Sequence, residues 1–191
     1  MANIITPTFR MNFPRLFKAE KNQLSGKEEF SVVALFPKGT DLSVLTKAVE
    51  EAINEKWPDK KKRPANLRTP IRAQDEKEQT AENGEKFMPA GYEKGAFFLN
   101  LKSQQRPGVV DQNVQPIIEE SEIYSGAYAR ASIRAYAYDQ AGNRGVSFGL
   151  VHVQKVKDGD PLTGRSKPEA DFAPIAGSGG ASPSDASALF S

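Results

Sequence analysis

Residues 127–138 alternate between two kinds of side chain at every position, and this pattern constrains the fold more than any other feature of the chain. The odd positions, from Ala127 to Ala137, carry five alanines and one isoleucine. The even positions, from Tyr128 to Tyr138, carry three tyrosines, two arginines and one serine. Because successive side chains of a strand point to opposite faces, the segment predicts one long strand with a thin apolar face and a face of rings and cations.

The ring-and-cation face has the chemistry that single-stranded nucleic acid requires, since bases stack on rings and phosphates pair with cations. The candidate binding residues on it are Tyr128, Arg130, Arg134, Tyr136 and Tyr138. The opposite assignment, with the tyrosines in the core, would bury two unpaired guanidinium groups at a cost of several kcal/mol. A bulge within the strand would reverse the phase partway and weaken this argument.

Further alternating segments predict strands at 9–17, 28–36, 96–102 and 144–156, with turns at 24–27 and 139–143. The first should bury Phe9, Met11 and Phe13. One helix should begin at Thr40 or Asp41 and end at Trp57, before Pro58. Residues 58–95 are polar and interrupted by proline and glycine, so they should form a long excursion with short strands at most.

These elements predict a mainly β fold, a single OB-like five-stranded Greek-key barrel with one helix and long loops, although a sandwich fits nearly as well. The barrel domain should span 1–165 and be followed by a disordered tail at 166–191. The tail contains a Gly/Ser linker at 176–184 and then an apolar pair, Leu189 and Phe190, which is a candidate partner-binding element.

Two more groups of side chains are candidates for DNA contacts. In the strand at 96–102, Phe98 and Lys102 share the face opposite Phe97, Leu99 and Leu101, and they offer another ring and cation. Positions 56–72 hold seven basic residues against one acid, and their core is Lys60, Lys61, Lys62 and Arg63. This run is either a flexible phosphate-binding arm or an ordinary solvated loop.

Composition argues against an enzyme. The chain has no cysteine and a single histidine, His152, so thiol nucleophiles, zinc fingers and iron–sulfur clusters are excluded. No phosphate-binding glycine loop of the Walker type is present. The acidic clusters at 75–78 and 119–122 fit solvated loops, and His152 fits a structural or surface role. We therefore expect no catalytic residue, no metal site and no cofactor.

Charge and hydropathy point to a polyanion partner inside the cell. The net charge is +2, but residues 168–191 hold three acids and no lysine or arginine, so the other 167 residues carry +5. No apolar run approaches the length of a membrane span, and the first residues lack the features of a secretion signal. These features predict a cytoplasmic protein.

Several motifs occur in the order found in one known family. They are Ile123-Tyr124-Ser125-Gly126-Ala127-Tyr128, Ala135-Tyr136-Ala137-Tyr138 and the segment from Asn143 to Leu150, with Arg106-Pro107-Gly108-Val109-Val110-Asp111 and Gly159-Asp160-Pro161 around them. Over most of 8–165 the chain resembles the bacteriophage single-stranded DNA-binding proteins of OB fold, a family formerly of unknown function.

The resemblance implies binding of single strands without sequence preference in phage replication or recombination, without catalysis, in the cytoplasm of the infected bacterial host. Oligomers on the DNA would be compatible with it. Many such proteins end in an acidic tail whose terminal aromatic recruits phage or host replication proteins. Phe190 matches that aromatic, whereas Asp185 is the only acid nearby. The alternatives are a phage structural or protein-interaction protein, whose tyrosine face would meet protein, and, less well supported, a nuclease or resolvase.

Overall fold

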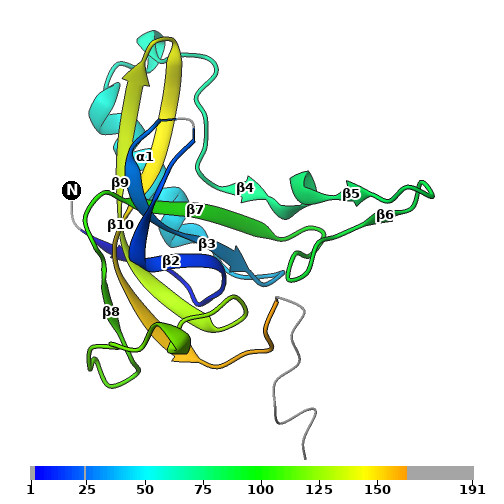
Figure 1. Cartoon of the computed structure of the whole chain (residues 1–191). Coiled ribbons are helices and arrows are strands. Elements are labelled where there is room, and N and C mark those ends of the chain that lie inside the picture. The colour runs from blue at the N-terminus through cyan, green and yellow to red at the C-terminus, as the bar shows by residue number, and fades with distance from the viewer. Residues whose placement is uncertain (1–2, 24, 163–191) are drawn as a thin grey trace, which may run out of the picture.

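The strand pairings close into a ring of five (Figure 1). The computed structural model describes residues 3–23 and 25–162. The ring runs through β2 (Phe9–Lys21), β3 (Glu28–Phe36), β7 (Phe97–Ser103), β10 (Asn143–Lys157) and β9 (Tyr128–Gln140), and returns to β2. All neighbours are antiparallel except β7 and β10, which run parallel where Gly149 faces Lys102. The predicted mainly β, OB-like barrel is confirmed, and a sandwich of two sheets is not formed.

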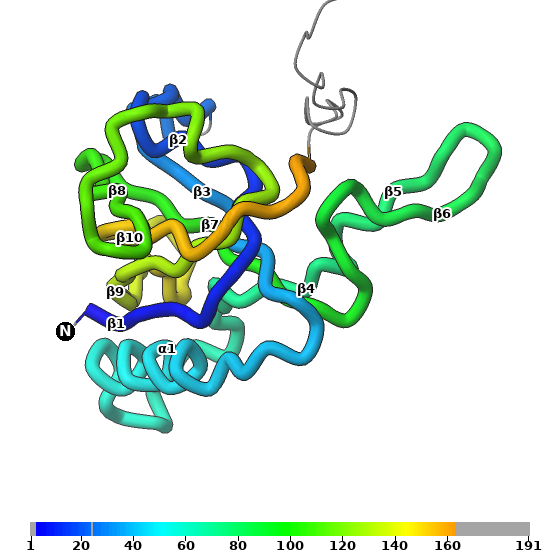
Figure 2. Tube along the Cα trace, turned by 90° about the horizontal axis from the view of Figure 1, so that it is seen from below, coloured from blue at the N-terminus to red at the C-terminus, as the bar shows by residue number. Residues whose placement is uncertain are grey.

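Short elements decorate this barrel. Along its margins β1 pairs with β9, β8 runs parallel to β10, and β4 pairs with β7. Their bounds are β1 (Ile4–Ile5), β4 (Arg72–Ala73) and β8 (Gly108–Val110), and three 3-10 helices span Lys60–Lys62, Gln74–Lys77 and Glu120–Glu122. Two further strands, β5 (Gln79–Thr80) and β6 (Lys86–Phe87), pair only with each other and project from the body as an arm (Figures 1 and 2).

Strand β9 keeps its two faces from its start to Tyr136, as the alternation predicts; beyond this point Ala137 and Tyr138 are both half-buried. The odd positions from Ala127 to Ala135 are at most 5% exposed and belong to the main core. Where the β9–β10 ladder shifts register, the extra residues Val151 and Val156 lie on β10. The bulges therefore leave the phase of β9 intact. Because alanine fills little space, the bulk of the core comes from other elements, notably Phe9, Phe36 and Phe148.

The helix and the tight turns follow their sequence signals. Helix α1 (Ser43–Lys56) begins where the Oδ1 atom of Asp41 accepts a hydrogen bond from the Ser43 N–H at 2.9 Å. It ends at Trp57, whose N–H donates to the Ile53 carbonyl at 2.8 Å. At the β9–β10 turn, Ala141 and Gly142 have φ of 48° and 83°, as a two-residue hairpin requires. Leu24 of the β2–β3 turn lies outside the described residues. No helix within the described ranges is long and apolar enough to cross a membrane.

Two expected orientations are wrong. Phe13 is 57% exposed with φ of 45°, and the β2–β3 register shifts between Asn12 and Arg15. Pro14 lies inside this irregular stretch and has no N–H to give to a ladder, so the alternation breaks before Phe13 can turn inward. At the start of β7, Phe97 is 43% exposed although it was expected on the inner face with Leu99 and Leu101.

After β10, residues 158–162 cross back over the barrel as a strap. The Tyr124 hydroxyl donates to Oδ1 of Asp158 at 2.8 Å, and burial together with this bond raises the pKa of Tyr124. Arg10 Nη2 donates to the Asp160 carbonyl at 2.6 Å, and the Leu162 N–H donates to the Ser125 carbonyl at 2.9 Å. The predicted tail at 166–191, with Leu189 and Phe190, lies outside the described residues.

The strap passes so close to Gly126 that a side chain does not fit there. A Cβ at Gly126, where φ is 117°, would lie 2.1 Å from the Asp160 carbonyl oxygen, whereas a Cβ at Gly142 would meet nothing within 4 Å. We expect Gly142→Ala to cost about 1–2 kcal/mol from backbone strain alone. Gly126→Ala should cost about 3 kcal/mol or more, because overpacking adds to the strain. Urea unfolding of both variants measures the difference, and equal losses would show that the strap is not seated here.

Candidate nucleic-acid interface

Two adjoining hollows on the outside of the barrel form one groove around Tyr136. Their volumes are about 450 and 310 Å³. They are continuous because they share five lining residues, Ser103, Gln105, Tyr136, Gly149 and Leu150. Strands β7, β9 and β10 supply most of the groove, and the segment after β7 closes one side. We call this site the Tyr136 groove.

The ring of Tyr136 is open to the groove because its neighbours on the next strand are small. Tyr136 is 48% exposed. It lies opposite Ser147 of β10, and Gly149 lies opposite Arg134. A Cβ built on Gly149 would approach the Tyr136 ring to 3.7 Å, an ordinary van der Waals distance, so the glycine leaves space beside the ring. A flat aromatic group can therefore reach one face of the tyrosine.

Three cations line the groove, and two of them have no carboxylate partner among the described residues. Arg134 donates to the amide oxygen of Asn3, with Nη2 at 3.2 Å, and this neutral partner leaves its charge in place. Arg106 lies with Cζ 5.7 Å from the centre of the Phe17 ring. The third cation, Lys102, pairs with Glu29 at 3.2 Å. The groove therefore offers a ring with positive charge on both sides.

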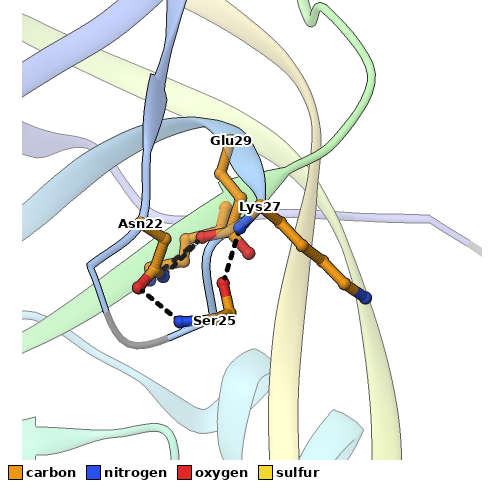
Figure 3. A network of polar contacts seen from close by, with 5 residues as sticks. Asn22, Ser25, Lys27 and Glu29 are labelled. Atoms are coloured by element: carbon orange, nitrogen blue, oxygen red, sulfur yellow. Dashed lines mark hydrogen bonds and ion pairs between the residues drawn. The ribbon is translucent and has the colours of Figure 1, made fainter.

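Glu29 is held in its ionised form by the β2–β3 turn. Its Oε2 atom accepts hydrogen bonds from the Asn22 amide at 2.8 Å and from Lys102 at 3.2 Å. These contacts, the Asn22 bond first, lower the pKa of Glu29. Figure 3 shows that Asn22 also receives the Ser25 N–H, while the Lys27 side chain points away from the network. The turn thus places one carboxylate at the rim of an otherwise cationic groove.

The other predicted residues of β9 face outward but lie away from the groove. Tyr128 is half-buried, with Lys157 Nζ 4.8 Å and Arg10 Cζ 5.9 Å from the centre of its ring. Arg130 donates to Oε1 of Gln154 at 2.7 Å and lines a separate hollow. Tyr138 is half-buried near the hairpin end of β9. At about 3.3 Å per residue, Tyr128 and Tyr138 are about 33 Å apart along the strand.

The expectation that Phe98 is an exposed stacking residue is wrong, because its side chain is fully buried. Strand β4 pairs with this part of β7 and brings Arg72 Cζ to 5.2 Å from the ring centre. Lys77 Nζ lies 5.4 Å from the same centre, and Tyr92 meets the ring edge-on at 6.2 Å. The alternation does place Phe98 on the outer face of β7, but β4, Lys77 and Tyr92, which together form the base of the arm, cover it.

The basic run at 56–72 is anchored at several points and does not line the Tyr136 groove. Arg63 donates to the Trp57 carbonyl at 3.0 Å and to the Asn54 side chain at 2.6 Å, so it secures the end of the helix. Further along, the Arg68 backbone bridges to β10 beside Gly145. Of the predicted cations, Lys62 lies 3.9 Å from Asp59, whereas Lys60 and Lys61 have no ion pair among the described residues.

Sequence reasoning missed four contributors to the groove, namely Arg106, Ser147, Gly149 and His152. The imidazole Nδ1 atom of His152 accepts the Gly108 N–H at 3.1 Å, which ties the segment after Arg106 to β10. The pairing of β8 with β10 is parallel and joins residues that lie 44 positions apart in the chain, so no local sequence pattern predicts it. Among the described residues, no group of three or more His, Asp or Glu side chains is placed to hold a metal ion.

A closed OB-like barrel with an aromatic and cationic groove on its outer face is the architecture typical of oligonucleotide-binding modules. The chain belongs to the family described as Enterobacter phage Enc34, ssDNA-binding protein, which matches residues 2–182. It is also 36% identical over 163 residues to protein p50 of Acyrthosiphon pisum secondary endosymbiont phage 1, covering 81% of this chain and 83% of that protein. The resemblance found in the motifs is confirmed.

Two solved structures share the fold. The single-stranded DNA-binding protein from bacteriophage Enc34, in complex with ssDNA, matches with a TM-score of 0.63 at 21% identity and covers 84% of this chain and 89% of that chain. The single-stranded DNA-binding protein gp2.5 of bacteriophage T7 matches with a TM-score of 0.54 at 12% identity, over 86% of this chain and 97% of that chain. At these identities the similarity concerns the architecture.

Truncation of Tyr136 and truncation of Phe98 should change the free energy of unfolding by very different amounts. Tyr136→Ala removes a ring that is half in solvent, so the free energy of unfolding should change by about 1 kcal/mol or less. Phe98→Ala empties a fully buried site and should cost about 3–5 kcal/mol. Thermal and urea unfolding compare the two. A large loss for Tyr136→Ala would mean that this ring supports the core.

Proposed function

We propose that this protein binds single-stranded DNA without sequence preference during phage replication or recombination. The observation that carries the proposal is the uncovered ring of Tyr136 between Arg134, Arg106 and Lys102. Membership of a family described as ssDNA-binding supports it, as does the shared fold with an Enc34 protein solved in complex with ssDNA. Residues 1–165 would form the binding unit, working in the cytoplasm of the infected bacterial host.

Binding would combine stacking with charge pairing. A base stacks on the Tyr136 ring, a contact that tolerates any sequence because every base has a π face and that is worth about 1–3 kcal/mol. The adjacent phosphates pair with Arg134 and Arg106, while Lys102 moves from Glu29 to phosphate. Glu29 stays ionised beside Lys102, so we expect Lys102 to contribute less than the two arginines. Sequence-tolerant affinity follows from these contacts.

Other predicted residues would lengthen the contact rather than form its centre. Tyr128 and Arg130 continue the outer face of β9 away from Tyr136, and Tyr138 continues it toward the hairpin tip. Lys60, Lys61 and Lys62 form a 3-10 helix just after α1, where they would attract the phosphate backbone. Arg63 has a structural task, so we assign it a smaller part in binding.

The protein would act as a binding protein and not as an enzyme, as the description of its family suggests. An alternative use of the same groove, as a docking site of a phage structural or interaction protein, is less favoured because the arginines on its walls have no carboxylate partner in the part of the chain that the structure describes. A titration with oligonucleotide separates the two, since only the first function requires tight binding to single strands.

The decisive measurement is a titration of fluorescein-labelled oligo-dT followed by anisotropy at several salt concentrations. Four or five phosphate contacts imply a log–log salt slope of roughly −3, and duplex should bind much more weakly. Tyr136→Ala should cost about 1–3 kcal/mol with little change in slope. Arg134→Ala should make the slope shallower by about 0.7. Equal affinity for duplex, or a flat salt response, would overturn the proposed function.

Gly149→Leu is the matched steric control for this titration. Its side chain would occupy the space beside the Tyr136 ring without removing either the ring or a charge. The backbone at Gly149 does not require a glycine, and a Cβ fits there, so the fold should survive. Binding should weaken while the melting temperature stays close to that of the unaltered protein.

The segment at 176–191 would recruit a phage or host replication protein through Leu189 and Phe190. We expect deletion of 176–191 to leave single-strand affinity equal or slightly higher at low salt, because Asp185 no longer competes for the cationic groove. Pull-down of replication proteins from infected cells should fail with the deletion and with Phe190→Ala. A several-fold loss of DNA affinity on deletion would instead place the segment in the binding surface.

A further inference from the structure

The backbone of Phe13 adopts a conformation that aromatic residues rarely adopt, and its ring is directed into solvent. Its φ is 45°, a value that favours glycine or asparagine and marks a bulky residue as an outlier. The surrounding structure enforces it, because the Phe13 N–H donates to Ser125 Oγ at 2.9 Å and to Asn12 Oδ1 at 3.1 Å. Strain of this kind at an exposed ring suggests that the ring has a task there.

Phe13 lines a hollow of about 310 Å³ together with residues of the segments that lead into and out of the arm. Figure 2 shows this arm, formed by β5 and β6, projecting from the body. The described residues that line the hollow include two rings, Phe13 and Tyr92, and one cation, Lys77, and none of them is a carboxylate. Lys77 is held nearby over the buried Phe98 ring. An aromatic wall beside a cation is the same combination as in the Tyr136 groove.

Among the described residues, the hollow at Phe13 has no lining residue in common with the Tyr136 groove, and a third hollow lies between them along β2. Two residues after Phe13, Arg15 lines this third hollow, where it pairs with Glu20 at 3.0 Å; the same hollow contains Glu29 and Lys102. These last two residues also line the Tyr136 groove. The two-residue step from Phe13 to Arg15 is about 7 Å at most. A single strand that leaves Tyr136 past Lys102 therefore reaches Phe13 on the same outer surface.

We propose that the hollow at Phe13 is a second base-binding subsite, which takes one unpaired base of the strand that occupies the Tyr136 groove. Phe13 and Tyr92 supply the aromatic wall, and Lys77 pairs with the neighbouring phosphate. The inference rests on the proposed function. It adds that the occluded strand extends to the base of the arm, so strands long enough to reach Phe13 gain affinity that shorter strands lack.

Phe13→Gly tests the subsite without threatening the fold, because glycine adopts a φ of 45° freely and the ring makes little core contact. Oligo-dT from about 4 to about 16 nucleotides spans the usual range of site sizes. The shortest oligomers that bind should have equal affinity for Phe13→Gly and the unaltered protein. The longer ones should bind the variant about tenfold more weakly. Phe87→Ala, which removes a 46% exposed ring from β6 outside the hollow, should change neither.

Photocrosslinking with oligo-dT that carries 5-iodouracil gives an independent result. Crosslinks to Phe13 or Tyr92 with long oligomers, in addition to Tyr136, would support the subsite. Equal binding by Phe13→Gly at every length, without crosslinks at Phe13 or Tyr92 and with Tyr136→Ala weakened, would overturn the subsite and leave the proposed function standing. If the unaltered protein bound no oligomer of any length, both proposals would fail.

Discussion

Burial of the odd-numbered face of β9 is the constraint on which the candidate contacts of this strand, with Tyr136 at their centre, depend. Since the side-chain period of a strand is two, a slip of one residue would send Arg130, Arg134 and Tyr136 into the core and the alanines into solvent. The ladder with β10 contains two register shifts, and both extra residues lie on β10. Strand β9 therefore presents one uninterrupted face outside the barrel. The closed ring also pairs both edges of every barrel strand, which removes most of the exposed edges that an open sheet would leave.

The site owes its openness to small and neutral neighbours as much as to Tyr136 itself. Ser147 and Gly149 leave the ring accessible, and an amide rather than a carboxylate holds Arg134. Asn22 engages the Glu29 carboxylate at the rim. On the proposed function, stacking and charge pairing at this surface would be indifferent to base sequence. This agrees with the description of the family to which the chain belongs.

The long excursion between α1 and β7 shapes the surface in two ways. Its base covers Phe98 through β4, Lys77 and Tyr92, and so removes one aromatic from the outer face. The same base forms a wall of the hollow at Phe13. Gln74 fixes it to the barrel, because its fully buried amide donates to the Phe36 and Phe97 carbonyls and accepts the Glu93 N–H. Gln74 therefore helps to hold the segment that covers Phe98 and forms a wall of the hollow at Phe13, together with the β4–β7 pairing.

The sequence by itself determined the strands, the helix and the two faces of β9, because these depend on the spacing of side chains along one segment. It also determined which residues of β9 face outward, and it revealed the family through motifs that lie close together in the chain.

Only the tertiary structure decided which of those outward residues share a groove. Arg106 and Lys102 join Tyr136 through the pairings of β8 and β7 with β10, which connect segments about 45 residues apart. The burial of Phe98 and the outward orientation of Phe13 were also decided by the tertiary structure. In the first case a distant segment packs over the strand, and in the second a proline-containing bulge interrupts the ladder. Neither feature can be read from the alternation of side chains, because that pattern reports the two faces of a single strand and not the segments that pack over it.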